Sequence, residues 1–123
     1  GASRHGVDGG MNRGEVWWAD LAEPKGSEPG SRRPVVVVQD DLLTRSLLAT
    51  VMVAPLTTNM QRAAAAGNVL LRARDSGLHR DSVLLVCQVM TIDKDLLTEC
   101  VGRVARRSMD LVDHGLRLAL DLT

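Results

Sequence analysis

The chain has 123 residues, of which 45% are hydrophobic, and this is enough for a single domain with one core. Lys and Arg number 15 and so do Asp and Glu, so the formal net charge is zero, and any contact with nucleic acid must depend on a local cluster of arginines rather than on bulk charge. No apolar run approaches the roughly 20 residues of a membrane helix, and no signal peptide is visible. We therefore expect a cytoplasmic protein with no membrane contact.

The start of the chain and the cysteines carry little functional signal. Residues 1–10, GASRHGVDGG, are typical of an expression-tag remnant, which leaves one predicted domain at 11–123. Cys87 and Cys100 have no CxxC spacing, no histidine at a ligand interval and no further cysteines to form a disulfide framework. We expect both to be reduced thiols in the core.

The first half of the chain predicts three strands. GEVWWADL (14–21) is rich in β-formers, and RPVVVVQ (33–39) has no polar alternation, which indicates a strand buried on both faces. ATVMVAPLTTN (49–59) is the third, and Pro55 within it indicates an edge strand or a bulge.

Shorter elements fill the remaining sequence. A loop is predicted at 22–32, a turn or helical piece at 40–48, and a helical turn or connector at 62–66. Strands are predicted at 67–73, at 82–92 with a bend, and at 101–106, with a short helix at 93–100 that Asp93 would cap.

A closing amphipathic helix is predicted near the C-terminus. Ser108 is the expected N-cap, and a stripe of apolar side chains would face the core or a dimer partner. The members of that stripe are Met109, Val112, Leu116 and Ala119 or Leu120. Because no βαβ alternation is present, the order predicts an α+β fold: a small, mostly antiparallel, barrel-like sheet with short helices and a C-terminal α-helix.

Two arginines stand where the first loop meets the valine-rich strand. A guanidinium group holds phosphate bidentately and stays charged at any working pH. Arg33 directly precedes the strand, so a rigid scaffold would position it, whereas Arg32 lies one residue further into the loop. The alternative is a solvated loop charge, or a surface ion pair with Glu28.

Polar groups end the third strand. Thr57, Thr58 and Asn59 can donate hydrogen bonds to phosphate oxygens, although the same residues also suit ordinary turns. Gln88 interrupts an apolar run and could contact a base edge or serve as a satisfied structural amide.

No histidine or catalytic motif competes with these groups. His79 and His114 are expected to face solvent, away from any nucleophile. The chain contains no HExxH, P-loop or GxSxG motif, so metalloprotease, nucleotide hydrolase and α/β-hydrolase functions find no support.

Five segments follow one another in a recognisable order. They are RGEVWWADL, GSEPGSRRPVVVVQDD, VAPLTTN, DSVLLVCQVMTIDKDLL, and VGRV with the amphipathic helix after it. Together they resemble the MazF/PemK family of toxin endoribonucleases from type II toxin–antitoxin systems, across residues 11–123.

The resemblance implies a barrel related to the Src-homology-3 type and to the gyrase poison CcdB, working as a homodimer. It implies cleavage of single-stranded RNA, often mRNA, at short motifs, without a metal or cofactor. The products would be a 2′,3′-cyclic phosphate and a 5′-hydroxyl, and the cleavage would inhibit growth. A MazE-like antitoxin would block the RNA groove.

The family's pattern also assigns roles to particular residues. Its catalytic arginine falls on Arg33 and its catalytic threonine on Thr57, both suited to stabilising a crowded phosphorane. Arg33 could also be the acid, and Glu28, at the family's loop glutamate, is the candidate base. The predicted RNA contacts are Gly26, Ser27, Arg32, Thr58, Asn59 and Gln88.

Some features leave a second function open. Pro29, Cys87 and Met90 depart from residues common in the family, which bears on the cleavage motif. The neutral net charge and the lack of an aromatic platform motivate the alternative of a same-fold toxin that acts by protein binding, as a gyrase poison does, without nuclease activity.

Overall fold

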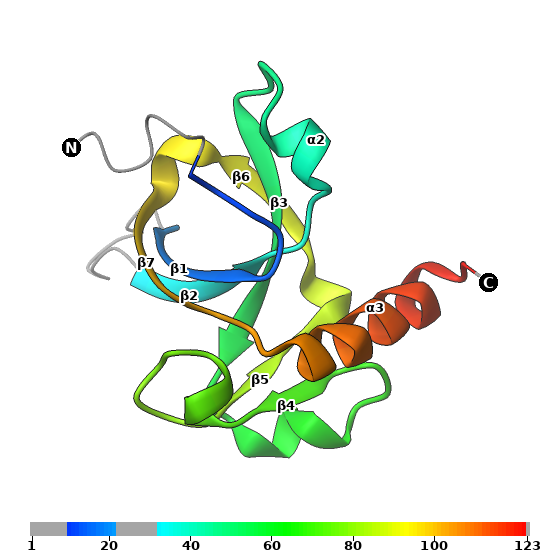
Figure 1. Cartoon of the computed structure of the whole chain (residues 1–123). Helices are drawn as coiled ribbons and strands as arrows, with labels where there is room; N and C mark the ends of the chain where they lie inside the picture. Colours follow the sequence, from blue (N-terminus) through cyan, green and yellow to red (C-terminus); the bar gives the residue numbers. More distant parts are fainter. Residues whose placement is uncertain (1–9, 22–31, 123) are drawn as a thin grey trace, which may run out of the picture.

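The computed structural model describes residues 10–21 and 32–122 (Figure 1). The strands are β1 (Glu15–Asp20), β2 (Arg32–Val37), β3 (Thr50–Thr57), β4 (Val69–Leu71), β5 (Ser82–Leu84), β6 (Met90–Asp93) and β7 (Leu97–Arg103). The helices are α2 (Asp41–Thr44) and α3 (Arg106–Leu120), and the 3₁₀ turns are η1 (Met60–Ala64), η2 (Ala73–Asp75), η3 (Val86–Gln88) and η4 (Lys94–Leu96). Most of the predicted tag remnant and nearly all of the first loop lie outside the described residues.

Every strand pair in the described part is antiparallel. The order is β4-β5-β3-β2-β1-β7, and β6 also pairs with β3. The sheet curls into a half-barrel, and α3 packs against the side that β4 and β5 complete (Figure 1). The predicted α+β, mostly antiparallel, barrel-like fold with a C-terminal helix is confirmed. No helix in these ranges is both long and apolar enough to cross a membrane.

The valine run of β2 is shared between two cores. Val35 and Val37 pack into one cluster with Trp17, while Val36 and Val38 pack into the other, which contains Val112 of α3. Successive side chains of a strand point to opposite faces, so a run without alternation fits a strand that is buried on both. The prediction of a doubly buried strand is confirmed.

Pro55 lies neither on an edge strand nor at a bulge of the β2–β3 pairing, so both alternatives of that prediction were wrong. Strand β3 is central: it pairs with β2 on one side, and on the other with β6 as far as Val53 and with β5 from Leu56. The Pro55 carbonyl accepts a hydrogen bond from Leu85 N at 3.0 Å, on the side where these two partners exchange. The N–H that Pro55 lacks would point to this same side, between the part of β3 that pairs with β6 and the part that pairs with β5. No ladder hydrogen bond is therefore lost.

The predicted bent strand at 82–92 is two separate strands in the structure. Strands β5 and β6 are separated by η3, whose Cys87 is exposed. Cys100 on β7 is exposed as well, so the expectation of two core thiols was wrong, although both cysteines are free.

Two helix predictions near the C-terminus need correction. The predicted helix at 93–100 is only the single turn η4, and β7 begins at Leu97 because that side chain is 2% exposed in the core and pairs with β1. The N-cap of α3 is Ala105, whose N–H bonds to the Asp75 carbonyl at 3.1 Å. Ser108 instead lies buried in the first turn of the helix.

The predicted apolar stripe of α3 holds for its first half. Val112 is fully buried, and Met109 and Leu116 pack against the same cluster, whereas Ala119 and Leu120 are exposed. The helix therefore contacts the core only through its first turns.

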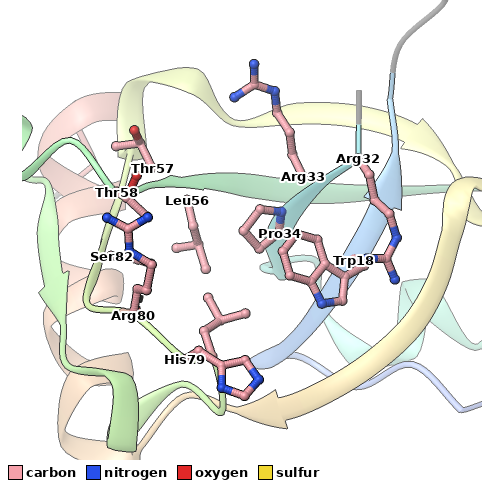
Figure 2. A pocket seen from close by; sticks show the side chains of 11 residues that line it. Trp18, Arg32, Arg33, Pro34, Leu56, Thr57, Thr58, His79, Arg80 and Ser82 are labelled. Atoms are coloured by element: carbon pink, nitrogen blue, oxygen red, sulfur yellow. Dashed lines mark hydrogen bonds between the residues drawn. The ribbon is translucent and has the colours of Figure 1, made fainter. Parts of the chain in front are cut away.

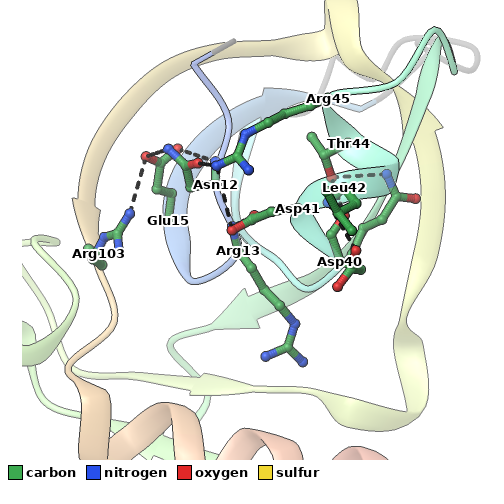
Figure 3. A network of polar contacts seen from close by, with 10 residues as sticks. Asn12, Arg13, Glu15, Asp40, Asp41, Leu42, Thr44, Arg45 and Arg103 are labelled. Atoms are coloured by element: carbon green, nitrogen blue, oxygen red, sulfur yellow. Dashed lines mark hydrogen bonds and ion pairs between the residues drawn. The ribbon is translucent and has the colours of Figure 1, made fainter. Parts of the chain in front are cut away.

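The Arg-Gly-Glu segment at 13–15 has a structural role (Figure 3). Arg13 donates from Nε to the Val38 carbonyl at 2.7 Å and pairs with Asp113 of α3 at 2.8 Å. Glu15 accepts from the Asn12 backbone at 2.9 Å. These contacts join the start of the domain to β2 and α3, and none of these side chains lines the pocket described below.

Helix α3 lies against the turn before β4 through two glycines. A Cβ on Gly115 would clash with the carbonyl oxygen of Gly67, which itself has a φ of +88°. Backbone thus meets backbone at this point, and no side chain of either residue could be accommodated.

We predict that Gly115→Ala destabilises the protein by about 1–3 kcal/mol, because overpacking forces α3 away from β4. At an unconstrained helix position the same change stabilises by about 1 kcal/mol, so the sign itself is informative. Urea unfolding measures the difference, with His114→Ala on the exposed face as control, expected within about 0.5 kcal/mol of the parent. A stabilised Gly115→Ala variant would contradict this packing.

Candidate active site

A pocket of about 570 Å³ opens where β2 begins and β3 ends (Figure 2). It is lined by Trp18, Arg32, Arg33, Pro34, Leu56, Thr57, Thr58, Leu78, His79, Arg80 and Ser82. One wall comes from β1, β2 and β3, and the other comes from the turn that precedes β5.

The structure brings Arg33 and Thr57 to the same pocket. The last pair of the β2–β3 ladder is Val35 with Pro55, and Arg33 and Thr57 each lie two residues beyond this pair on their own strands. Side-chain direction repeats every two residues along a strand, which places the two on the same face of the ladder. The two residues are 24 positions apart in the sequence (57 minus 33), and the pairing of β2 with β3 brings them to one pocket.

Arg33 and Thr57 differ in how they are held. Arg33 is exposed and makes no ion pair with any residue in the ranges 10–21 and 32–122. Thr57 is half-buried, and its Oγ1 accepts a hydrogen bond from Asn59 N at 3.1 Å. The guanidinium can therefore take up an anion, and the hydroxyl oxygen is fixed while its hydrogen can be donated to a ligand.

Arg32 is engaged by two neighbours. Its guanidinium pairs with Glu99 of β7 at 3.0 Å and lies 4.7 Å from the centre of the Trp18 ring. Both partners of the ion pair are more than half exposed, so the pair adds little stability, but it holds Arg32 over the indole.

The other predicted RNA contacts are distributed differently. Thr58 lines the pocket, whereas Asn59 does not and uses its side chain to cap η1 through Gln61 N at 3.1 Å. Gln88 is exposed on η3 and also lies outside the lining. The predicted residues Gly26, Ser27 and Glu28 lie outside the described residues, so their roles stay predictions.

Sequence reasoning missed the wall formed by Leu78, His79, Arg80 and Ser82. His79 faces solvent as predicted, yet it lines the same pocket as Arg33 and Thr57. The reason is a strand pairing: Thr57 stands opposite Val83 in the β3–β5 ladder, which brings the preceding turn across the pocket. The one signal in the sequence was the polar run His79-Arg80-Asp81 directly before the strand at 82–92.

No group of three or more His, Cys, Asp or Glu side chains that could hold a metal ion occurs in the part of the chain that the structure describes.

Comparison with known proteins agrees with this fold. Residues 12–120 match the model of the family described as PemK-like, MazF-like toxin of type II toxin–antitoxin system. The chain belongs to the PemK/MazF family.

Curated relatives of this PemK/MazF chain are similar over nearly its whole length. Endoribonuclease MazF6 of Mycobacterium tuberculosis is 48% identical over 112 residues, which cover 91% of this chain and 98% of the relative. Endoribonuclease EndoA of Bacillus subtilis is 40% identical over 112 residues, with coverages of 91% and 96%.

Solved structures share the PemK/MazF fold. Mycobacterium tuberculosis toxin MazF-mt6 superposes with a TM-score of 0.73 at 25% identity, over 89% of this chain and 98% of that one. A mycobacterial endoribonuclease in complex with its cognate antitoxin gives a TM-score of 0.72 at 24% identity, with coverages of 92% and 95%. The MazE–MazF structure (Form-II) from Deinococcus radiodurans gives 0.77 at 19% identity, with coverages of 92% and 97%.

In this PemK/MazF chain, Asp81 fixes the turn that forms the second wall. Its carboxylate accepts hydrogen bonds from Ala73 N at 2.8 Å and from Arg72 at 3.2 Å. The backbone hydrogen bond from Ala73, with a smaller contribution from Arg72, lowers the pKa of Asp81 below its ordinary value of 3.8. Gly77 in the same turn has a φ of +85°, and a Cβ there would clash with the Val101 carbonyl.

We predict that Asp81→Ala lowers the melting temperature at pH 7 and that this difference disappears in acid. A carboxyl whose folded-state pKa is depressed stabilises the fold above its unfolded pKa, and this contribution is lost as the pH falls through the folded-state pKa. The difference should therefore shrink progressively below about pH 3.8. Thermal melts across this range test it, with exposed Asp95→Ala as control; a difference independent of pH would contradict the prediction.

Proposed function

We propose that this chain is the toxin of a type II toxin–antitoxin system and cuts single-stranded RNA, in particular mRNA, at short sequence motifs. The observation that supports this most directly is the meeting of Arg33 and Thr57 at one open pocket. A guanidinium without an ion-pair partner in the described residues and an oriented hydroxyl, at the ends of two neighbouring core strands, suit a phosphate whose charge increases during reaction. The endoribonuclease names of the curated relatives agree with this proposal.

The chemistry we propose is transfer of the phosphate to the neighbouring ribose hydroxyl. The 2′-oxygen forms a bond to phosphorus while the bond from phosphorus to the 5′-oxygen breaks. A base takes the 2′-proton and an acid returns one to the 5′-oxygen. The products are a 2′,3′-cyclic phosphate and a 5′-hydroxyl, and the atoms balance without a metal, a cofactor or an added water.

Arg33 and Thr57 would stabilise the pentacoordinate phosphorane through donors that are already in place. Strand β2 anchors the backbone of Arg33 because the valines that follow it are buried in both cores, so only the side chain has to adjust to meet the developing charge. Arg33 is also our candidate acid. Glu28, in the loop that enters β2, is our candidate base, since a guanidinium with a pKa above about 12 is a poor one.

We also propose the partners. A MazE-like antitoxin would cover this pocket. The solved structures with a similar fold include a mycobacterial endoribonuclease with its cognate antitoxin and a MazE–MazF structure. Two copies would form a homodimer, for which the exposed leucines Leu111, Leu118 and Leu120 of α3 offer apolar surface. Because mRNA is the proposed substrate, the site of action would be the cytoplasm.

We predict that Arg33→Ala and Thr57→Ala each slow RNA cleavage by about 10²–10³-fold, the typical effect of removing one transition-state donor. The assay uses a long RNA with chelator present and detects cyclic-phosphate and 5′-hydroxyl ends. The exposed Arg107→Ala on α3, outside the pocket, is the matched charge control and should cut as the parent does.

Two outcomes would contradict the proposed function. One is cleavage by both pocket variants at the parental rate. The other is growth inhibition by the parent protein with no RNA cleavage, which would favour the protein-binding alternative of the gyrase-poison type.

A further inference from the structure

We infer that the pocket has two chemically different ends, and that the end formed by Trp18 and His79 binds one nucleobase next to the phosphate that is cut. This inference rests on the proposed RNA cleavage and specifies how the same site would select its substrate. Figure 2 shows Trp18 and His79 at one end of the pocket and Thr57 and Thr58 at the other.

The pocket is larger and more apolar than the binding of a phosphate group alone requires. About 570 Å³ lies within the range of sites that enclose a whole small-molecule ligand. Three of the residues that line the pocket are apolar, namely Pro34, Leu56 and Leu78. Apolar side chains offer no hydrogen bond to a phosphate oxygen. The flat face of a base, in contrast, is removed from water when it packs against them, which is favourable.

Trp18 is oriented before any ligand arrives. Its backbone is held on both sides, opposite Pro34 in β2 and Glu99 in β7. The Arg32 guanidinium lies 4.7 Å from the centre of the indole and is itself held by Glu99 at 3.0 Å. A ring that is fixed in this way loses little conformational freedom when a base packs beside it.

His79 supplies the part that can discriminate between bases. Its exposed imidazole is presented by a turn that Asp81 ties to Ala73 and Arg72. In the neutral form the ring offers one donor and one acceptor at its edge, and also a flat face. A base edge displays the complementary groups, and a phosphate displays acceptors only.

The first experiment compares cut-site maps from sequencing of 5′-hydroxyl ends on one long RNA, for the parent protein, His79→Ala and His114→Ala. We expect His79→Ala to lower the rate ratio between favoured and disfavoured bases by about tenfold at one position beside the cut, with the other positions unchanged. His114 is an exposed histidine on α3 and serves as the control, so its variant should keep the parental motif.

The results distinguish this inference from the proposed function. If the parent protein cuts RNA and His79→Ala slows every site by the same factor with an unchanged motif, the base subsite is wrong and the proposed function stands. If the parent protein produces no cyclic-phosphate ends, both are wrong. A motif change of the same size in His114→Ala would also overturn the assignment.

A binding experiment tests Trp18 without relying on catalysis. The probe is an oligonucleotide of the mapped motif with a 2′-deoxyribose at the cut, which prevents the reaction, with and without the flanking base. We expect loss of that base to weaken binding by the parent protein about tenfold, and by Trp18→Leu less than twofold. An equal loss in both proteins would overturn the role of Trp18; if Trp18→Leu does not fold, Trp18→Met, which also removes the aromatic face, gives the same comparison.

Discussion

Strand β3 is hydrogen-bonded to β2 along one side and divided between β6 and β5 along the other, and the rest of the molecule depends on this arrangement. The exchange of partners occurs at Pro55, whose carbonyl accepts from Leu85 N and whose missing N–H costs no ladder hydrogen bond at this position. It lets the sheet turn from the half-barrel into the β4–β5 hairpin without an unsatisfied buried donor. The turn before β5 thereby comes to face the end of β3.

The two cores explain why this scaffold can hold charged groups in place. Valines of β2 alternate between the cluster around Trp17 and the cluster beneath α3, so neither face of the strand is free to move. Arg33 extends from the end of this clamped strand, and Thr57 from the end of its neighbour. Donors that need no reorganisation stabilise developing charge far better than mobile ones, so the packing of the valines and the proposed chemistry are parts of one arrangement.

The opposite wall of the pocket has a different character. It is a turn, fixed by the Asp81 carboxylate and by the close approach of Gly77 to β7, and its Leu78 packs against the core cluster beneath α3 while His79 is exposed. Side chains on such a turn, His79 among them, can be exchanged without disturbing β2 or β3. The division between a rigid wall for the phosphate and a turn-borne wall for the base would let the cleavage motif change while the reaction stays the same.

The sequence by itself determined the strands with strong composition and the residues at their ends. The valine run, the threonine-terminated strand and the amphipathic stripe at Met109 and Val112 are local patterns, and each became the element it predicted. Arg33 and Thr57 could be singled out because each directly adjoins such a strand. The ordered motifs also indicated the family, which residues 12–120 match.

Only the tertiary structure decided which segments pair with one another and which side chains they bring together. A short mixed segment has no strong local preference, so only one turn formed after Asp93, and strand β7 began at Leu97, which is buried against β1. Cys87, expected in the core, is exposed on η3. The same holds for His79: nothing in its own neighbourhood connects it to Thr57, and the β3–β5 register does. Local pattern fixes what a segment can be, and long-range pairing, which depends on residues far away in the chain, fixes what it faces.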